Sequence, residues 1–280
     1  MEKAKIAALI ILIAILVFVL STALPDLGYD WTHTYRPAAL AMANGNSPYT
    51  VEIYYAAPWA VLPLIPFALL PEKIGNIFIF LLGLFAFAFI AYKLNPKPTV
   101  IILFMLSAPV TGCLIWGNIE WMPLLGLVLP IPIGLIFAVI KPQVGIGLII
   151  YWFFHLMKTQ GLIGTVKAFL PVTIITLLSF WLYGFWPLRF QDTLALSASS
   201  DAQYNITLWP YGIFVGIWLL YKALQHQKLG TAIAASPFLS PYTLQYTWVT
   251  VLAGVTHAPM ELLLVSIGLW IPVVLRILGQ

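Results

Sequence analysis

The chain has 280 residues, of which 62% are hydrophobic and only 8% are charged, and its mean hydropathy is +0.99. Soluble globular domains contain about 25% charged residues, so this chain has too few charges to cover a surface that faces water. The composition excludes a soluble enzyme, a disordered chain and a nucleic-acid-binding protein, and it favours an integral membrane protein. The net charge of +4 is scattered and forms no phosphate-binding patch. Cys113 is the only cysteine, which excludes an intrachain disulfide and a cysteine-cluster metal site.

The first apolar stretch, residues 4–24, follows Lys3 and predicts a transmembrane helix, which requires about 20 apolar residues. It is longer than the ~7–15-residue apolar core of a signal peptide, so we expect it to be retained. Later apolar runs predict further helices at 74–92, 99–115, 119–131, 132–140, 143–157, 163–186, 206–224, 231–252 and 257–276.

Prolines interrupt this pattern in three places. The runs at 119–131 and 132–140 are too short to cross a bilayer, and the prolines around them predict discontinuous helices that line a cavity. Residues 57–71, APWAVLPLIPFALLP, predict a broken helix that lies in the membrane interface. Ser236-Pro237 and Ser240-Pro241 predict kinks within a span. We therefore expect an all-α polytopic membrane protein, a single transmembrane domain over 1–280 with about 9–10 helices or half-helices.

The distribution of charge predicts the orientation. If the N-terminus is cytoplasmic and 57–71 stays on the far side, nine of the 13 basic residues face the cytoplasm and four lie outside. This is the asymmetry that the positive-inside rule requires. It predicts a multi-pass protein with both termini in the cytoplasm, and we expect the membrane to be a prokaryotic plasma membrane. Two external loops, 25–73 and 187–205, then contain most of the acidic residues, and we expect function there.

The first external loop has the sequence features of a structured cap. Residues 34–43 predict a short helix, with Thr34 as the capping residue and Pro37 in the first turn. Asn44-Gly45-Asn46 ends it. Asp26 and Asp30 directly follow the first span, where a carboxylate can face an aqueous cavity or can be merely solvated.

Three motifs follow one another in the first 160 residues: Asp30-Trp-Thr-His-Thr-Tyr35, Gly45-Asn-Ser-Pro-Tyr49 and Ile140-Lys141-Pro142-Gln143. Their order resembles glycosyltransferase family 87, polytopic enzymes of the GT-C architecture that take a sugar, usually mannose, from a polyprenyl-phosphate carrier. The chain departs from the family pattern at two points. Gly117-Asn118-Ile119-Glu120 stands for Gly-Gln-x-Asn, and Ala57-Pro58 stands for a double proline.

The resemblance implies a GT-C-like bundle and an inverting transfer of a hexose to a lipid or glycan acceptor on the extracytoplasmic face. It makes Asp30 the general base that takes the proton from the acceptor hydroxyl. Asp26 is the competing carboxylate, but only Asp30 has the aromatic residue and Tyr35 at the family spacing.

The leaving phosphate in such a reaction needs cations. Lys141 is the first candidate, and a lysine that extends to the interface without any role in chemistry is the alternative. Arg36 and Arg189 are the second candidates, since a guanidinium suits phosphate oxygens, although headgroup or loop-carboxylate contacts are equally compatible with their positions. Glu120 is by default a carboxylate at the membrane interface, and the alternatives are that it contacts sugar hydroxyls or pairs with Lys141. The other candidate substrate-binding residues are Gln143, Tyr35, His33 and Asn118.

His257 and Glu261 share a helix face, but the metalloprotease pattern HExxH is missing, so we expect no metal and no cofactor. Asn205-Ile-Thr207 is an N-glycosylation sequon that matters only in a secretory membrane. The expected partners are a polyprenyl-phosphate sugar and membrane lipids, with a monomer as the default. The alternative function is a non-catalytic relative, or a lipid or solute transporter, that serves as a membrane assembly subunit.

Overall fold

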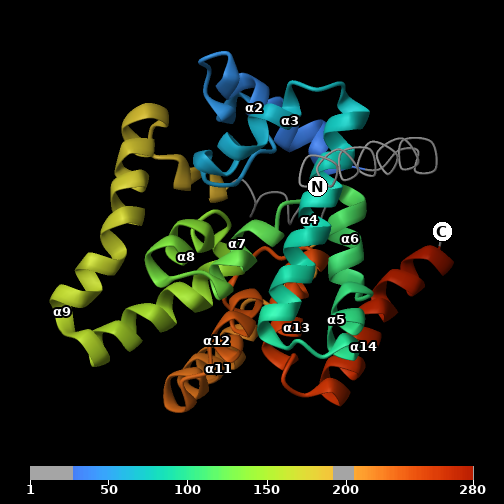
Figure 1. Cartoon of the computed structure of the whole chain (residues 1–280), viewed down its shortest axis with the longest axis vertical. Coiled ribbons are helices and arrows are strands. Elements are labelled where there is room, and N and C mark those ends of the chain that lie inside the picture. Colours follow the sequence, from blue (N-terminus) through green and yellow to red (C-terminus); the bar gives the residue numbers. More distant parts are fainter. Residues whose placement is uncertain (1–27, 192–204, 280) are drawn as a thin grey trace, which may run out of the picture. The chain divides into compact units, whose positions relative to one another are not determined.

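A computed structural model describes residues 28–191 and 205–279, and within these ranges the chain is all-helical, with no strand (Figure 1). The helix expected at 4–24, Asp26 and most of the loop 187–205 lie outside the described residues. Contacts divide the chain into two compact units. Unit 1 contains the described residues up to Tyr54, together with Val61–Leu84 and Leu114–Asn118. Unit 2 contains Tyr55–Ala60, Phe85–Cys113 and the described residues from Ile119 onward.

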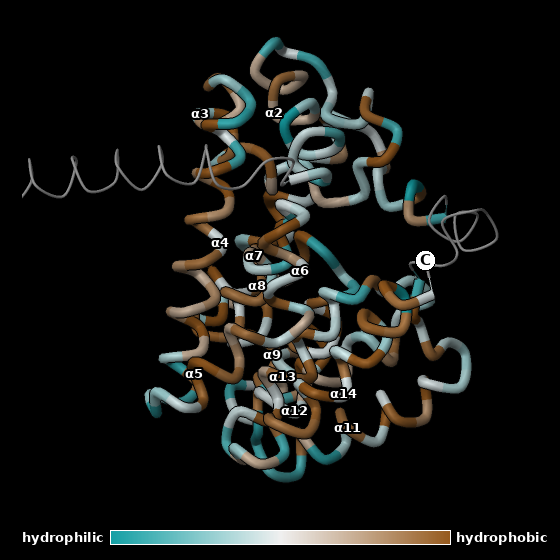
Figure 2. Tube along the Cα trace, turned by 90° about the vertical axis from the view of Figure 1, so that its right-hand side faces the viewer, coloured by the Kyte–Doolittle hydropathy of each residue, from teal (hydrophilic) through white to brown (hydrophobic). Residues whose placement is uncertain are grey.

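Three described helices are long and apolar enough to cross a membrane: α4 (Glu72–Leu94), α9 (Pro142–Tyr183) and α14 (Pro259–Leu278). A fourth candidate is the pair α5 (Pro98–Met105) and α6 (Ala108–Trp116), which is bent by 54°. The spans expected at 74–92 and 257–276 are confirmed as helices by α4 and α14. Figure 2 shows hydrophobic residues along both α4 and α5. These helices support a membrane protein.

A single glycine divides α9. Gly161 has φ 67° and ψ −171°, a conformation open essentially to glycine alone, and it separates helical residues 142–160 from 162–183. Figure 1 shows the corner that the helix turns there. The structure therefore confirms two separate helices in this region, with bounds that differ from the expected 143–157 and 163–186.

The last third of the chain is more broken than expected. The run at 206–224 becomes α11 (Gly212–His226). The single span expected at 231–252 is wrong, because residues 240 and 244 are extended and interrupt it. The reason is local: the residue before a proline is pushed out of the helical region, and Ser240 precedes Pro241. The pieces are α12 (Leu229–Ala234), η8 (Ser236–Leu239), η9 (Gln245–Trp248) and α13 (Val249–Val255).

Unit 1 begins with a π-helix, η1 (Trp31–Tyr35), followed directly by α2 (Arg36–Ala43). The helix expected at 34–43 is thus nearly right, and Pro37 lies in its first turn. Thr34 is not its cap, however, because the helix starts earlier and Thr34 lies buried inside η1. Asn44 ends α2, and Gly45 follows with φ 76°. The short helix η2 (Pro48–Thr50) completes this part of the unit.

The proline-rich segment at 57–71 forms three short helices and no span. They are η3 (Pro58–Ala60), η4 (Leu62–Leu64) and α3 (Ile65–Ala68). These lengths agree with the expectation that the segment does not cross the membrane, and the breaks between the three helices agree with the proline-broken helix that the sequence predicts.

The middle of unit 2 consists of short helices packed against α9. These are α7 (Trp121–Leu125), η5 (Gly126–Val128) and α8 (Ile131–Ala138). Glycines bring the backbones together: a Cβ at Gly145 would collide with the carbonyl of Ala138, and one at Gly147 would collide with the carbonyl of Ala232. The broken pieces expected at 119–131 and 132–140 are therefore present. A short 3₁₀ helix, η6 (Trp186–Arg189), follows α9.

Candidate functional site

A chain of hydrogen bonds holds the Asp30 side chain in unit 1. The Asn118 Nδ2 donates to Asp30 Oδ2 at 2.5 Å, and the Tyr35 hydroxyl donates to Asn118 Oδ1 at 3.1 Å. Tyr35 and Asn118 are buried, whereas Asp30 is partly exposed. Asp30 and Tyr35 of one motif and Asn118 of another, which were expected as the base and as substrate-binding residues, therefore lie together.

Local backbone geometry explains why Asn118 reaches Asp30. Trp31, the first residue of η1, is completely buried. Gly117 has φ 68°, and a Cβ at this position would lie 2.9 Å from the Cβ of Trp31. The backbone N–H of Gly28 donates to the carbonyl oxygen of Ile115 at 2.8 Å. The close approach of residues 114–118 to the start of η1 thus depends on a glycine directly before Asn118.

This arrangement suits a general base. Two buried neighbours fix the orientation of the carboxylate, and its partial exposure leaves it accessible to a substrate hydroxyl. Single-turn π-helices also occur frequently at functional sites.

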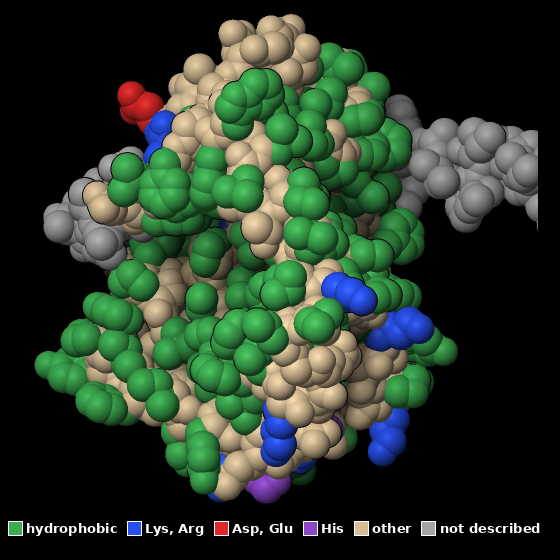
Figure 3. All heavy atoms as spheres, turned by 90° about the vertical axis from the view of Figure 1, so that its left-hand side faces the viewer, with side chains coloured by type: hydrophobic (Ala, Val, Ile, Leu, Met, Phe, Trp, Pro, Cys, Tyr) green, Lys and Arg blue, Asp and Glu red, His purple; other side chains and the backbone are tan. Residues whose placement is uncertain are grey.

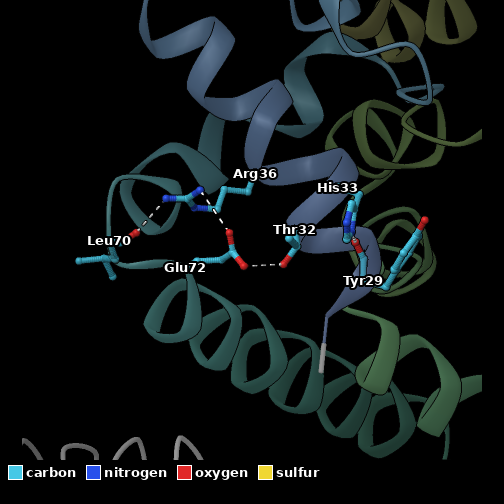
Figure 4. Close-up of polar contacts among 6 residues, drawn as sticks. All are labelled: Tyr29, Thr32, His33, Arg36, Leu70 and Glu72. Atoms are coloured by element: carbon cyan, nitrogen blue, oxygen red, sulfur yellow. Dashed lines mark hydrogen bonds and ion pairs between the residues drawn. The ribbon is translucent and has the colours of Figure 1, made fainter. Parts of the chain in front are cut away.

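His33 and Tyr29 form an exposed stacked pair beside η1 (Figure 4). Their ring centroids are 4.2 Å apart, and His33 Nδ1 lies 3.0 Å from the Tyr29 carbonyl oxygen. Because a carbonyl oxygen only accepts, this contact places the proton on Nδ1. His33 is exposed and presents an aromatic face at the surface.

Arg36 points towards Glu72 and Leu70 (Figure 4). Its Nη1 lies 3.7 Å from Glu72 Oε2, and its Nη2 donates to the Leu70 carbonyl oxygen at 3.5 Å. Thr32 donates to Glu72 Oε1 at 3.3 Å. The loop-carboxylate contact that the sequence left open for Arg36 is thus formed. The side chains of Arg36 and Glu72 are 24% and 50% exposed, and exposed pairs of this kind contribute only ~0.2–1 kcal/mol.

Three tyrosines pack against one another in the same unit. The Tyr54 ring centroid lies 6.4 Å from that of Tyr35 and 5.5 Å from that of Tyr49. Burial, together with the neighbouring phenols of Tyr49 and Tyr35, raises the pKa of Tyr54 well above its ordinary value. Sequence reasoning missed Tyr54, because it stands in a polar loop with no hydrophobic period to mark it as buried.

Unit 2 contains a buried ion pair. Lys141 Nζ lies 3.0 Å from Glu120 Oε1, and the two side chains are only 7% and 1% exposed. The structure confirms the pairing of Glu120 with Lys141, which was one of the alternatives, and the default of an interface carboxylate is wrong because the Glu120 side chain is buried. Lys141 precedes α9 and Gln143 lies in its first turn, while Arg189 ends η6.

The sequon asparagine has a structural role. Asn205 Oδ1 accepts from the backbone N–H of Thr243 at 3.0 Å and from that of Thr207 at 3.3 Å. Asn205 Nδ2 donates to the Pro241 carbonyl oxygen at 3.5 Å. The amide that a glycan would modify thus connects two extended segments.

Within 28–191 and 205–279, no group of three or more His, Cys, Asp or Glu side chains is placed to hold a metal ion. Comparisons with protein-family models, with curated proteins and with solved structures find no match for the chain. The resemblance to glycosyltransferase family 87 rests on the sequence motifs.

Proposed function

We propose that the chain is a membrane glycosyltransferase of the GT-C type. It transfers a hexose, with mannose as the first candidate, from a polyprenyl-phosphate sugar to a lipid or glycan acceptor. The reaction takes place on the extracytoplasmic face of a prokaryotic plasma membrane, in a multi-pass bundle with both termini in the cytoplasm. The observation that carries the proposal is the partly exposed Asp30 carboxylate held by Asn118 at 2.5 Å.

Asp30 acts as the general base in this proposal. The acceptor hydroxyl donates its proton to the carboxylate while its oxygen attacks the anomeric carbon. The bond from that carbon to the phosphate oxygen breaks on the opposite side, and the carrier leaves as a polyprenyl phosphate, so the configuration inverts. A positioned base of this kind contributes typically ~10²–10⁴-fold in rate.

Arg36 is the candidate cation of unit 1 for the leaving phosphate, and we favour it. Its ion pair with Glu72 is partly exposed, so exchanging the carboxylate for a phosphate oxygen costs little. Lys141 is less suited to this exchange, because its partner Glu120 is almost completely buried. His33 and Tyr29 present an exposed aromatic face on which a sugar ring can pack.

The test is transfer from a labelled polyprenyl-phosphate mannose by purified wild type and by Asp30→Asn. We expect the variant to lose about 10²–10⁴-fold in rate while unfolding at a similar temperature. Glu52→Gln is the matched control, since Glu52 is an exposed carboxylate of the same unit, and it should keep full activity. Undiminished transfer by Asp30→Asn would reject Asp30 as the base. No transfer by wild type from any polyprenyl-phosphate hexose would favour the transport or assembly function.

A further inference from the structure

The segment between Glu120 and Lys141 folds back on itself. One leg consists of α7 and η5 over residues 121–128, and the other is α8 over residues 131–138. Leu129 and Pro130 between them are extended, with ψ 161° and 140°. At 1.5–2.0 Å per residue each leg is about 12–14 Å long. Neither leg comes close to the ~30 Å of a hydrocarbon core.

The two legs are in backbone contact. A Cβ at Gly126 would lie 2.7 Å from the carbonyl oxygen of Gly134, and the reverse distance is also 2.7 Å. The Trp152 ring of α9 also lies against Gly134, at 2.8 Å from a Cβ added there. The legs therefore form one antiparallel hairpin, backed by α9.

The ends of this hairpin meet. The ion pair of Glu120 with Lys141 joins the residue before the first leg to a residue after the second. The neighbouring segment of unit 2 closes the same end: Ala57 donates its N–H to the Ile140 carbonyl oxygen at 3.0 Å, and Trp59 Nε1 donates to the Ile136 carbonyl oxygen at 3.1 Å. Residues 121–140 contain no Asp, Glu, Lys or Arg. The charged residues are thus confined to the open end, and the closed end is apolar.

The lysines of unit 2 gather at its opposite end. Residues 142–160 lead from Lys141 to the corner at Gly161, a distance of about 28 Å at 1.5 Å per residue. Lys158 and Lys167 flank that corner. Residues 162–183 then return, so that Trp186 packs against Trp59 with ring centroids 5.9 Å apart. The open end of the hairpin and the corner of α9 are therefore separated by about the thickness of a bilayer.

Other lysine-bearing turns share the end where α9 turns. Lys97 precedes α5, and Lys228 precedes α12. Figure 1 shows these two turns and the corner of α9 at the lower end of unit 2. Figure 3 shows that hydrophobic side chains cover much of this face and that Lys and Arg side chains are few and scattered on it.

We infer that residues 119–141 form a re-entrant hairpin, which enters the membrane from the side opposite the lysine-bearing turns and returns to that same side. Charged residues inside a bilayer are rare and are paired, and Glu120 and Lys141 satisfy this condition at the entry point. Non-helical backbone at membrane depth is tolerated where protein buries it, as the contacts of the legs with α9 allow. By the positive-inside rule the lysine end is cytoplasmic, so the hairpin opens to the extracytoplasmic side. The inference does not depend on sugar transfer.

Cysteine labelling in membrane vesicles tests this topology. In a Cys113→Ala background, single cysteines replace Leu188 near the open end of the hairpin, Thr159 beside the corner of α9, and Pro130 at the hairpin tip. All three positions are exposed on the protein. A membrane-impermeant maleimide is added to right-side-out and to inside-out vesicles.

We expect Leu188→Cys to react from the extracytoplasmic side and Thr159→Cys from the cytoplasmic side. Pro130→Cys should react from neither side, yet should react fully after denaturation in detergent. Ile133→Cys, 48% exposed on α8, repeats the tip measurement without removing a proline and should behave in the same way. Reaction of both tip cysteines from the cytoplasmic side would show that the segment crosses the membrane and would overturn the inference. Reaction of Leu188→Cys and Thr159→Cys from the same side would overturn it as well.

Discussion

Replacing Lys141 with methionine removes the cation that lies 3.0 Å from Glu120, at a place where that carboxylate is only 1% exposed. At an effective dielectric constant of ~20, two unit charges at this separation attract each other by about 5–6 kcal/mol. Breaking a buried pair by removing one partner typically costs about 3–5 kcal/mol, because the remaining charge stays in a medium of low polarity. At ~2–4 °C per kcal/mol for a chain of this size class, Lys141→Met should unfold about 6–20 °C below wild type.

The assay is thermal unfolding in detergent, followed by tryptophan fluorescence. The double variant Lys141→Met with Glu120→Met is the decisive comparison, because replacing both partners of a buried pair by apolar residues is often neutral or stabilising. We expect the double variant to unfold close to wild type and well above either single variant. Two results would contradict this reasoning. One is that Lys141→Met alone unfolds within about 2 °C of wild type. The other is that the loss of stability in the double variant equals the sum of the losses in the two single variants, because Glu120 and Lys141 would then not depend on each other.

Two further predictions concern unit 1. Gly117→Ala places a methyl group 2.9 Å from the Cβ of Trp31 at φ 68° and should destabilise the protein by about 1–3 kcal/mol. The control is Gly112→Ala inside α6, where nothing lies within 4 Å of the added Cβ. Because alanine favours a helix over glycine, this control should leave the unfolding temperature unchanged or slightly raised. Burial raises the pKa of Tyr54 above its ordinary value of 10.0. Above pH 10 the unfolded chain therefore loses the phenol proton while the folded protein still keeps it. The contribution of Tyr54 to stability consequently falls as the pH rises above 10. Unfolding temperatures measured from about pH 8 to about pH 11 should therefore decline less steeply in Tyr54→Phe than in wild type, and equal slopes would contradict the burial of this phenol.

Helices with a continuous apolar run could be predicted from the sequence, because the length of such a run alone decides whether it can cross a bilayer. This holds for α4 and α14. The region 231–252 shows where the argument fails. Its hydropathy is that of a span, but the Ser240-Pro241 pair ends the helix. The proline keeps Ser240 out of the helical conformation, and a hydropathy average over many residues is not sensitive to the conformation of one residue.

The residues of the candidate site could be predicted from the sequence, but the contacts between them could not. Asp30 and Asn118 are 88 residues apart, and their hydrogen bond depends on Gly117, whose role appears only when residues 114–118 lie against Trp31. Tyr54 gave no signal in the sequence, because its burial results from the packing of other tyrosines around it. The pairing of Glu120 with Lys141 was foreseeable, since two opposite charges in apolar surroundings stabilise each other.

Gly161 determines whether α9 is one long rod or two helices, each of about the length that a membrane span requires. If residue 161 were helical, residues 142–183 would form one straight rod of about 63 Å, roughly twice the thickness of a hydrocarbon core. Half of that rod would carry apolar side chains such as Ile163 and Trp181, now 72% and 81% exposed, into water. One residue without a side chain therefore divides α9 into two helices of about the length of a bilayer core, without any intervening loop.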